Sequence, residues 1–193
     1  MSKVTKDSII TLPNSHLRQR SKKVGIINDD IKKIIDDMEL AVIDWDKSRA
    51  HEVTVALAAV QIDSLLRLVI IRDDFDHGTP AKYTALINPE IMKYEGEIEY
   101  DYEGCLSIRS VYGHVPRHSK IRVKARDLDG KEIRFNATGF LSRVIQHEVD
   151  HTNGKLFVDH IKHAEDAFYK LTNKGDLVEL DYEKDIKNSR ILW

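Results

Sequence analysis

Apolar residues recur at helical spacing between Asn28 and Trp45, with charged residues between them. Such a pattern places the apolar side chains on one face of a helix. Asn28 and the two aspartates after it suit the first turn, where side-chain oxygens accept hydrogen bonds from free backbone N–H groups. The sequence therefore predicts an amphipathic helix packed on a core through five residues, Ile31, Ile35, Met38, Val42 and Trp45.

The middle of the chain changes to short runs rich in Val and Ile, which are typical of strands. These runs extend from Val53 to Ile71, and strand-like segments interrupted by Pro89 and Gly96 continue from Ala85 to Tyr100. The run Leu65 to Ile71 has the composition of a buried strand.

A hairpin is predicted next, because apolar residues alternate with basic ones from Ile121 to Arg126 and alternation resumes at Ile133 and Phe135. Asp129-Gly130 between the two runs suits a tight turn. This alternation predicts one buried and one wet face.

Helical spacing returns from Gly139 to His151, and Ala164 to Leu171 is predicted as a further short helix. Strands in the middle with helices toward both ends favour an α+β fold. No linker or repeat divides the chain, so we expect one domain over residues 1–193, with the charged tail 173–193 as its most mobile part.

Composition excludes several classes of protein. The chain of 193 residues has 30 Lys+Arg against 32 Asp+Glu, a formal net charge of −2, which argues against a DNA partner held by a basic surface. The single cysteine, Cys105, cannot form an intramolecular disulfide. Because no apolar run resembles a signal peptide or reaches the roughly 18 residues of a membrane span, we expect a cytoplasmic protein without a membrane partner.

The segment Gln146 to His151 carries the chemistry. His147 and His151 lie four residues apart, and Glu148 follows the first histidine. On a helix this HExxH spacing presents two imidazoles to one metal ion, and the glutamate lies close enough to exchange a proton with water at the metal. The segment predicts a hydrolytic metal site.

Such a site needs a third protein ligand. The longer metzincin pattern would place a histidine where this chain has Phe157, and a thermolysin-like site would want a glutamate near Leu171. Both classes are disfavoured. Cys105 would complete a Cys-His-His site, although a lone cysteine is more often a small buried hydrophobic residue.

Three ordered motifs resemble those of the peptide deformylase family: VALAAVQ at Val55–Gln61, EGCLS at Glu103–Ser107 and QHEVDHTNG at Gln146–Gly154. The similarity covers most of residues 10 to 165. The longer segment before the first motif, and Val111 to Arg117, are closer to the subgroup of Gram-positive bacteria and their wall-less relatives.

The resemblance implies an α+β domain of mixed, mostly antiparallel sheets around a central metal-binding HExxH helix. It implies a metal-dependent hydrolase that removes the formyl group from the N-terminal formylmethionine of new polypeptides and releases formate, with a metal-bound water as the nucleophile. It also implies one divalent ion held by Cys105, His147 and His151, with Fe²⁺ natural and Zn²⁺, Ni²⁺ or Co²⁺ as substitutes.

By the same resemblance, Glu148 is the general base and then the general acid, while Gln61 and the backbone N–H of Leu106 donate to the oxyanion. Less specific roles fall to a supporting group and to a methionine pocket. The supporting residues are Glu103, Arg117 and Asp150, each of which taken alone could also be a solvated surface charge. The pocket residues are Val55, Ala56, Phe140 and Val144, and the last two could also belong to the core.

Four positions depart from the family pattern. Thr54 and Ala56 stand where glycines are usual, Thr152 replaces a leucine, and Arg143 takes a position that is commonly apolar. None removes a ligand or the base, so we expect activity to survive with altered substrate or inhibitor fit. Two alternatives stay open: another metal-dependent amidohydrolase or peptidase, and a deformylase-like protein that binds nascent chains, with transient ribosome contact, without turnover.

Overall fold

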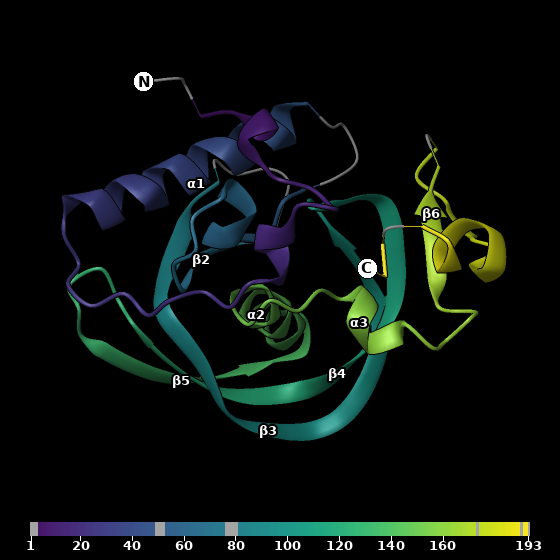
Figure 1. Cartoon of the computed structure of the whole chain (residues 1–193). Coiled ribbons are helices and arrows are strands. Elements are labelled where there is room, and N and C mark those ends of the chain that lie inside the picture. The colour runs from purple at the N-terminus through teal and green to yellow at the C-terminus, as the bar shows by residue number, and fades with distance from the viewer. Residues whose placement is uncertain (1–3, 49–52, 76–80, 173, 190, 193) are drawn as a thin grey trace.

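An antiparallel sheet curls around one helix in the computed structural model (Figure 1), which describes residues 4–48, 53–75, 81–172, 174–189 and 191–192. The strand order is β1-β2-β3-β4-β6-β7, and β5 also pairs with β4. The strands are β1 (Ala56–Ala58), β2 (Leu68–Arg72), β3 (Tyr83–Cys105), β4 (Ile108–Arg126), β5 (Glu132–Thr138), β6 (Phe168–Leu171) and β7 (Leu177–Glu179). The helices are α1 (Asp29–Lys47), α2 (Gly139–Thr152) and α3 (Val158–Ile161), with short 3-10 turns at Lys6–Ser8, Ser15–Arg18 and Ala59–Ile62. The predicted α+β fold is confirmed.

The predicted amphipathic helix is α1. The Asn28 side chain accepts a hydrogen bond from the backbone N–H of Ile31, and the helix begins at Asp29. All five predicted core residues are buried, together with Ala41.

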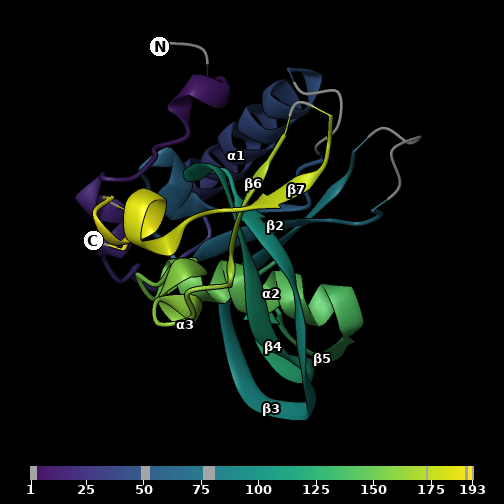
Figure 2. The same ribbon diagram turned by 90° about the vertical axis from the view of Figure 1, so that its right-hand side faces the viewer.

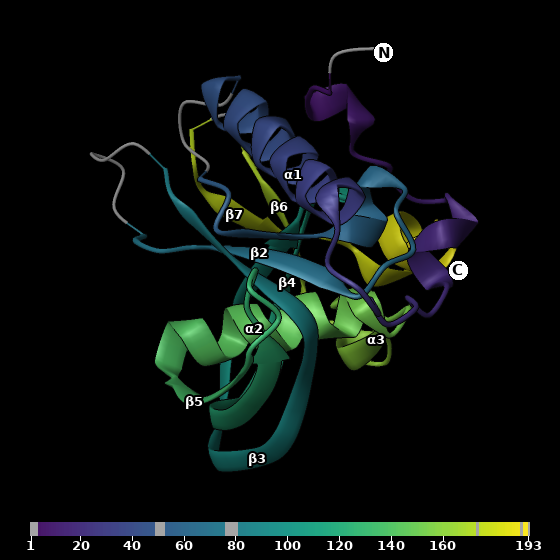
Figure 3. The same cartoon turned by 90° about the vertical axis from the view of Figure 1, so that its left-hand side faces the viewer.

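Strand β2 lies between α1 and α2, as Figure 3 shows. Alternate residues of a strand point to opposite faces. Leu68 and Ile70 accordingly join the core under α1, whereas Val69 and Ile71 join the core around α2. Burial on both faces explains why this segment is continuously apolar.

Strands β3 and β4 form one long hairpin that wraps around α2 (Figure 1). The strand-like segments predicted between Ala85 and Tyr100 are parts of the single strand β3. Pro89 and Gly96 lie at shifts in its pairing with β4, one between Ile87 and Glu90 and one between Glu95 and Ile98. Such bulges bend a strand, which allows the sheet to curl. The predicted hairpin of β4 and β5 is also present.

Helix α2 runs through the centre of this curled sheet, and its Val144, Ile145 and Val149 side chains are buried in the core. It ends at Thr152, and Gly154, two residues later, adopts a left-handed conformation with φ of 73°. A Cβ atom there would lie 2.4 Å from the carbonyl oxygen of Arg18, so glycine allows the close approach of that backbone.

The helix predicted from Ala164 to Leu171 is wrong. Helix α3 ends earlier, at Ile161, and Phe168–Leu171 forms strand β6. The cause is tertiary: Phe168 and Tyr169 pair with Gly113 and Tyr112 of β4, and the Phe168 side chain is fully buried. Figure 2 shows the β6–β7 pair rising above α3 toward the end of α1.

The chain after residue 173 contains β7 and a short π-helical turn, Tyr182–Lys187. Ile186 of this turn is buried, and the Tyr182 hydroxyl donates a 2.6 Å hydrogen bond to the carbonyl of Lys162. The mobility of residues 173–193 stays a prediction. None of the helices in the described ranges combines the length and apolar character that a membrane-spanning helix requires.

Candidate metal centre

Cys105, His147 and His151 form a cluster in which one possible ligand atom of each residue lies within 4.8 Å of the others. Helix α2 supplies both histidines from adjacent turns, and Cys105 lies where β3 ends. Cys105 Sγ is 3.3 Å from His151 Nε2. In a tetrahedral site, the usual metal–sulfur and metal–nitrogen bond lengths place neighbouring sulfur and nitrogen donor atoms roughly 3.5 Å apart. The donor set and spacing therefore fit one divalent transition metal.

The two histidines differ in charge before a metal binds. Burial and the neighbouring His147 keep the pKa of His151 well below its usual value, so this imidazole is neutral. Burial also opposes the charged form of His147, but hydrogen bonds with Cys105 and Glu103 raise its pKa well above the usual value. Metal binding at this cluster would therefore displace a proton.

Glu103 orients His147. The Nδ1 atom of His147 donates a 2.9 Å hydrogen bond to Glu103 Oε2, which leaves Nε2 as the possible ligand. Glu103 is buried, yet hydrogen bonds from His147 and Arg117 outweigh burial and hold its pKa well below the usual range. The carboxylate is thus a permanent anion beside the cluster.

Arg117 joins two carboxylates near the metal cluster, those of Glu103 and Asp150. Its Nε and Nη2 atoms donate to the two oxygens of Glu103 at 2.9 and 3.0 Å, and Nη1 donates to Asp150. His160 Nε2 lies 2.7 Å from Asp150 Oδ2. The structure brings Glu103, Arg117 and Asp150 together, and it adds His160, for which the sequence pattern gives no signal.

Arg143 is a second buried cation at Glu103. Its Nη1 atom donates to Glu103 Oε1 and to the carbonyl of Val115, both at 2.8 Å, and Nη2 donates to the carbonyl of Glu99 at 2.7 Å. These contacts connect α2 to both strands of the long hairpin. Arg143, which departs from the family pattern, is therefore a buried charge whose hydrogen bonds are satisfied.

Glu148 lies one residue beyond His147 and is 5% exposed. Burial raises the pKa of its carboxyl to about 7. Within the described residues its Oε2 atom has no hydrogen-bond partner. A carboxyl group with such a pKa can both accept and return a proton near neutral pH.

Gln61 follows strand β1 and its side chain is held at both ends. Its Oε1 atom accepts a 2.9 Å hydrogen bond from the backbone N–H of Ala58, and its Nε2 atom lies 3.2 Å from Ser107 Oγ and 3.6 Å from Cys105 Sγ. Leu106 lies in the turn between β3 and β4, beside Cys105. Ser107, fully buried, was missed by sequence reasoning, although it ends the EGCLS motif.

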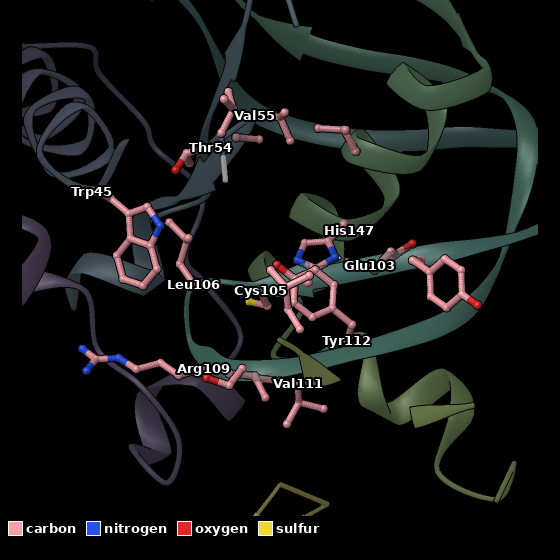
Figure 4. Close-up of a pocket in the computed structure, with 18 of the residues that line it drawn as sticks. Trp45, Thr54, Val55, Glu103, Cys105, Leu106, Arg109, Val111, Tyr112 and His147 are labelled. Carbon is pink, nitrogen blue, oxygen red and sulfur yellow. Dashed lines mark hydrogen bonds and ion pairs between the residues drawn. The ribbon is translucent and has the colours of Figure 1, made fainter. Parts of the chain in front are cut away.

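A cavity of about 790 Å³ is lined by several of these residues: Gln61, Glu103, Cys105, Leu106, Arg143, His147 and Glu148. Its walls include all four predicted pocket residues, Val55, Ala56, Phe140 and Val144. Figure 4 shows Cys105, Glu103 and His147 together, with Thr54 and Val55 across the cavity from Val111 and Tyr112.

The other three departures are accommodated without backbone strain. Neither Thr54 nor Ala56 has a positive φ, so their side chains narrow the cleft without straining it. Thr152 is fully buried, and its hydroxyl donates a 2.8 Å hydrogen bond to the carbonyl of Val149.

Comparison with known proteins agrees with this arrangement. The family model described as polypeptide deformylase matches residues 6–167. The chain belongs to this family. The match contains the deformylase motifs with all three residues of the cluster, and it ends just before β6.

Curated relatives support the assignment to the deformylase family. A peptide deformylase of Thermomicrobium roseum is 40% identical over 80% of this chain and 85% of the relative. Peptide deformylase 1 of Pseudomonas syringae is 39% identical over 80% of this chain and 86% of the relative.

Solved structures show the same fold. A peptide deformylase from Synechococcus elongatus in complex with actinonin is 36% identical with a TM-score of 0.71, covering 81% of this chain and 80% of that one. A class I type b deformylase from Acinetobacter baumannii with bound Met-Ala-Ser is 28% identical with a TM-score of 0.70, covering 79% of this chain and 96% of that one.

Proposed function

We propose that this chain removes the formyl group from the N-terminal formylmethionine of newly made polypeptides and releases formate. The observation that carries the proposal is the cluster of Cys105, His147 and His151 beside the buried Glu148, with Cys105, His147 and Glu148 lining a cavity of about 790 Å³. Family membership supports the same reaction.

One divalent cation is the implied cofactor, held by the thiolate of Cys105 and the two imidazoles. When bound, such an ion lowers the pKa of water toward neutrality and polarises a carbonyl oxygen. We propose Fe²⁺ as the natural ion, with Zn²⁺, Ni²⁺ or Co²⁺ as substitutes, since soft sulfur and imidazole ligands suit these metals. Metal analysis of protein purified without oxygen tests the choice.

Glu148 moves the proton in this proposal. Its carboxylate takes a proton from the attacking water and later delivers it to the amine that leaves. The pKa of about 7 supports both steps, because the group is close to half protonated at neutral pH.

Gln61 and Leu106 stabilise the oxyanion. Since the backbone N–H of Ala58 holds Gln61 Oε1, the amide Nε2 is directed toward Cys105, where it can donate to the developing charge. The backbone N–H of Leu106 is the second donor. Val55, Ala56, Phe140 and Val144 hold the methionine side chain, while Glu103, Arg117 and Asp150 keep His147 oriented.

An assay with formyl-Met-Ala tests this function. The Fe²⁺-loaded protein, kept without oxygen, should release formate and free amine together, and acetyl-Met-Ala should be left largely intact because the site is sized for a formyl group. Equal cleavage of both peptides would favour a general amidohydrolase or peptidase. No release with metal bound would leave a protein that binds nascent chains without turnover.

The wider setting is also proposed. The chain acts in the cytoplasm, as a single catalytic domain over residues 1–193, on nascent chains and with transient ribosome contact. It is closer to the Gram-positive subgroup, a proposal supported by Val111 to Arg117 and by the longer segment before the first motif, in which residues 49–52 lie outside the described part. Cosedimentation with ribosomes tests the contact.

A further inference from the structure

The outer part of the cavity has a wall that the family match does not include. Lys170, Leu171 and Thr172 line the cavity, and they belong to or directly follow strand β6, beyond the matched residues 6–167. Pairing of β6 with Tyr112 and Gly113 of β4 fixes this wall beside the segment that starts at Ile108.

This outer wall is positively charged. Arg109 of β4 and Lys170 of β6 both line the cavity and both are exposed. Neither forms an ion pair with another residue in the part of the chain that the structure describes.

Among the described residues that line the cavity, no exposed acidic residue accompanies these two cations. The acidic residues among the described lining are Glu103 and Glu148, and both are buried at the metal cluster. Glu103 is already paired with Arg117 and Arg143. The exposed charges of the described lining, those of Arg109 and Lys170, are therefore positive.

Under the proposed function, a peptide reacts at its first residue beside Cys105 and His147. The residues after methionine then share the cavity with the exposed side chains of Arg109 and Lys170, which line it.

We propose that Arg109 and Lys170 form a downstream subsite that selects peptides with a carboxylate side chain at the second or third residue. This inference rests on the proposed function. Opposite charges at a partly exposed site attract modestly, and the attraction weakens as salt screens it.

The test compares matched formylated peptides on the Fe²⁺-loaded protein without oxygen. The peptides are formyl-Met-Glu-Ala against formyl-Met-Gln-Ala, and formyl-Met-Ala-Glu against formyl-Met-Ala-Gln. We expect kcat/KM to favour the glutamate peptide of at least one pair by about twofold to fivefold at low salt. The preference should shrink in 0.5 M NaCl, where the screening length falls to roughly 4 Å.

We expect the ratio of kcat/KM for the glutamate peptide to kcat/KM for the glutamine peptide to fall close to one in Arg109→Gln, in Lys170→Gln and in the double variant. Lys174→Gln is the matched control, because Lys174 is an exposed lysine in the turn after β6 that does not line the cavity. It should keep the wild-type ratio.

Product binding separates the two proposals. Calorimetry with Met-Ala-Glu and Met-Ala-Gln, and with Met-Glu-Ala and Met-Gln-Ala, reports the subsite without turnover. Absence of turnover for every formylated peptide would overturn the proposed function, whereas turnover with ratios of one at both positions, or ratios unchanged in the double variant, would overturn only the subsite.

Discussion

At the scale of single residues, Glu148 is a group whose burial disfavours its charged form and so suits it to proton transfer. Its carboxyl is buried beside a histidine of the metal cluster, and burial raises its pKa to about 7. An ordinary exposed glutamate would be fully ionised at neutral pH and a poor acid. The HExxH motif identified this residue, but its protonation depends on neighbours that the motif does not specify.

Replacing Glu148 with glutamine should remove the proton carrier and keep the metal. General acid and base catalysis contributes about 10²–10⁴ in rate, so we expect kcat for formyl-Met-Ala to fall by at least about 10²-fold. Rate measurements and metal analysis on the same sample check this. Near wild-type turnover would show that another group moves the proton.

The same substitution should stabilise the metal-free chain at alkaline pH. Because the folded-state pKa of Glu148 is raised from 4.5 to about 7, the carboxyl stabilises the fold fully below pH 4.5, and this contribution is lost as the pH rises toward 7. At pH 8 the buried charge should make the free energy of unfolding of the wild-type protein lower than that of Glu148→Gln by on the order of 3 kcal/mol. Denaturant unfolding of both proteins at pH 5 and pH 8 measures the difference, which should be smaller at pH 5. Equal stability at both would contradict the burial argument.

Gln61 gives a second prediction at this scale. Gln61→Ala removes the amide that points toward Cys105, and loss of one oxyanion donor costs about 10²–10³ in kcat. Binding of the product Met-Ala should change far less, since the donor acts on the charge that develops in the reaction. Ser107→Ala is the comparison, because it removes a neighbour of Gln61 Nε2 and leaves the amide in place.

At the scale of elements, a regular local pattern of apolar residues is sufficient to predict a helix or a hairpin. An element that forms through long-range pairing cannot be predicted from such a pattern. Helix α1, helix α2 and the β4–β5 hairpin follow from local patterns of apolar residues. Strand β6 does not, because its conformation is imposed by pairing with β4 and by burial of Phe168. The contact between Arg143 and Glu103 was missed for the same reason, since it joins residues 40 positions apart.

Phe168→Ala tests whether β6 belongs to the core. Phe168 is fully buried in a cluster with Phe157 and Ile161, and removal of a buried phenylalanine side chain costs about 3–5 kcal/mol. Val178→Ala on β7, where the side chain is 53% exposed, is the control and should cost under about 1 kcal/mol. Urea denaturation measures both. A small effect of Phe168→Ala would mean that β6 contributes little to folding.

At the scale of the whole molecule, the fold brings a cysteine and two histidines from distant segments to one point. The sheet curls around α2, and the end of β3 places Cys105 beside the helix that carries His147 and His151. Sequence reasoning reached this set through the ordered motifs. The supporting contacts of Arg143 and His160 required the structure, because they depend on how β3, β4, α2 and α3 pack.

Removal and return of the metal show whether the site of Cys105, His147 and His151 is required for deformylation. Formate release from formyl-Met-Ala-Ser is followed without oxygen on the purified protein, after complete chelation, and after addition of one equivalent of Fe²⁺. We predict that release stops on chelation and returns with Fe²⁺. Release that continues at the original rate after the metal has been removed would contradict the account.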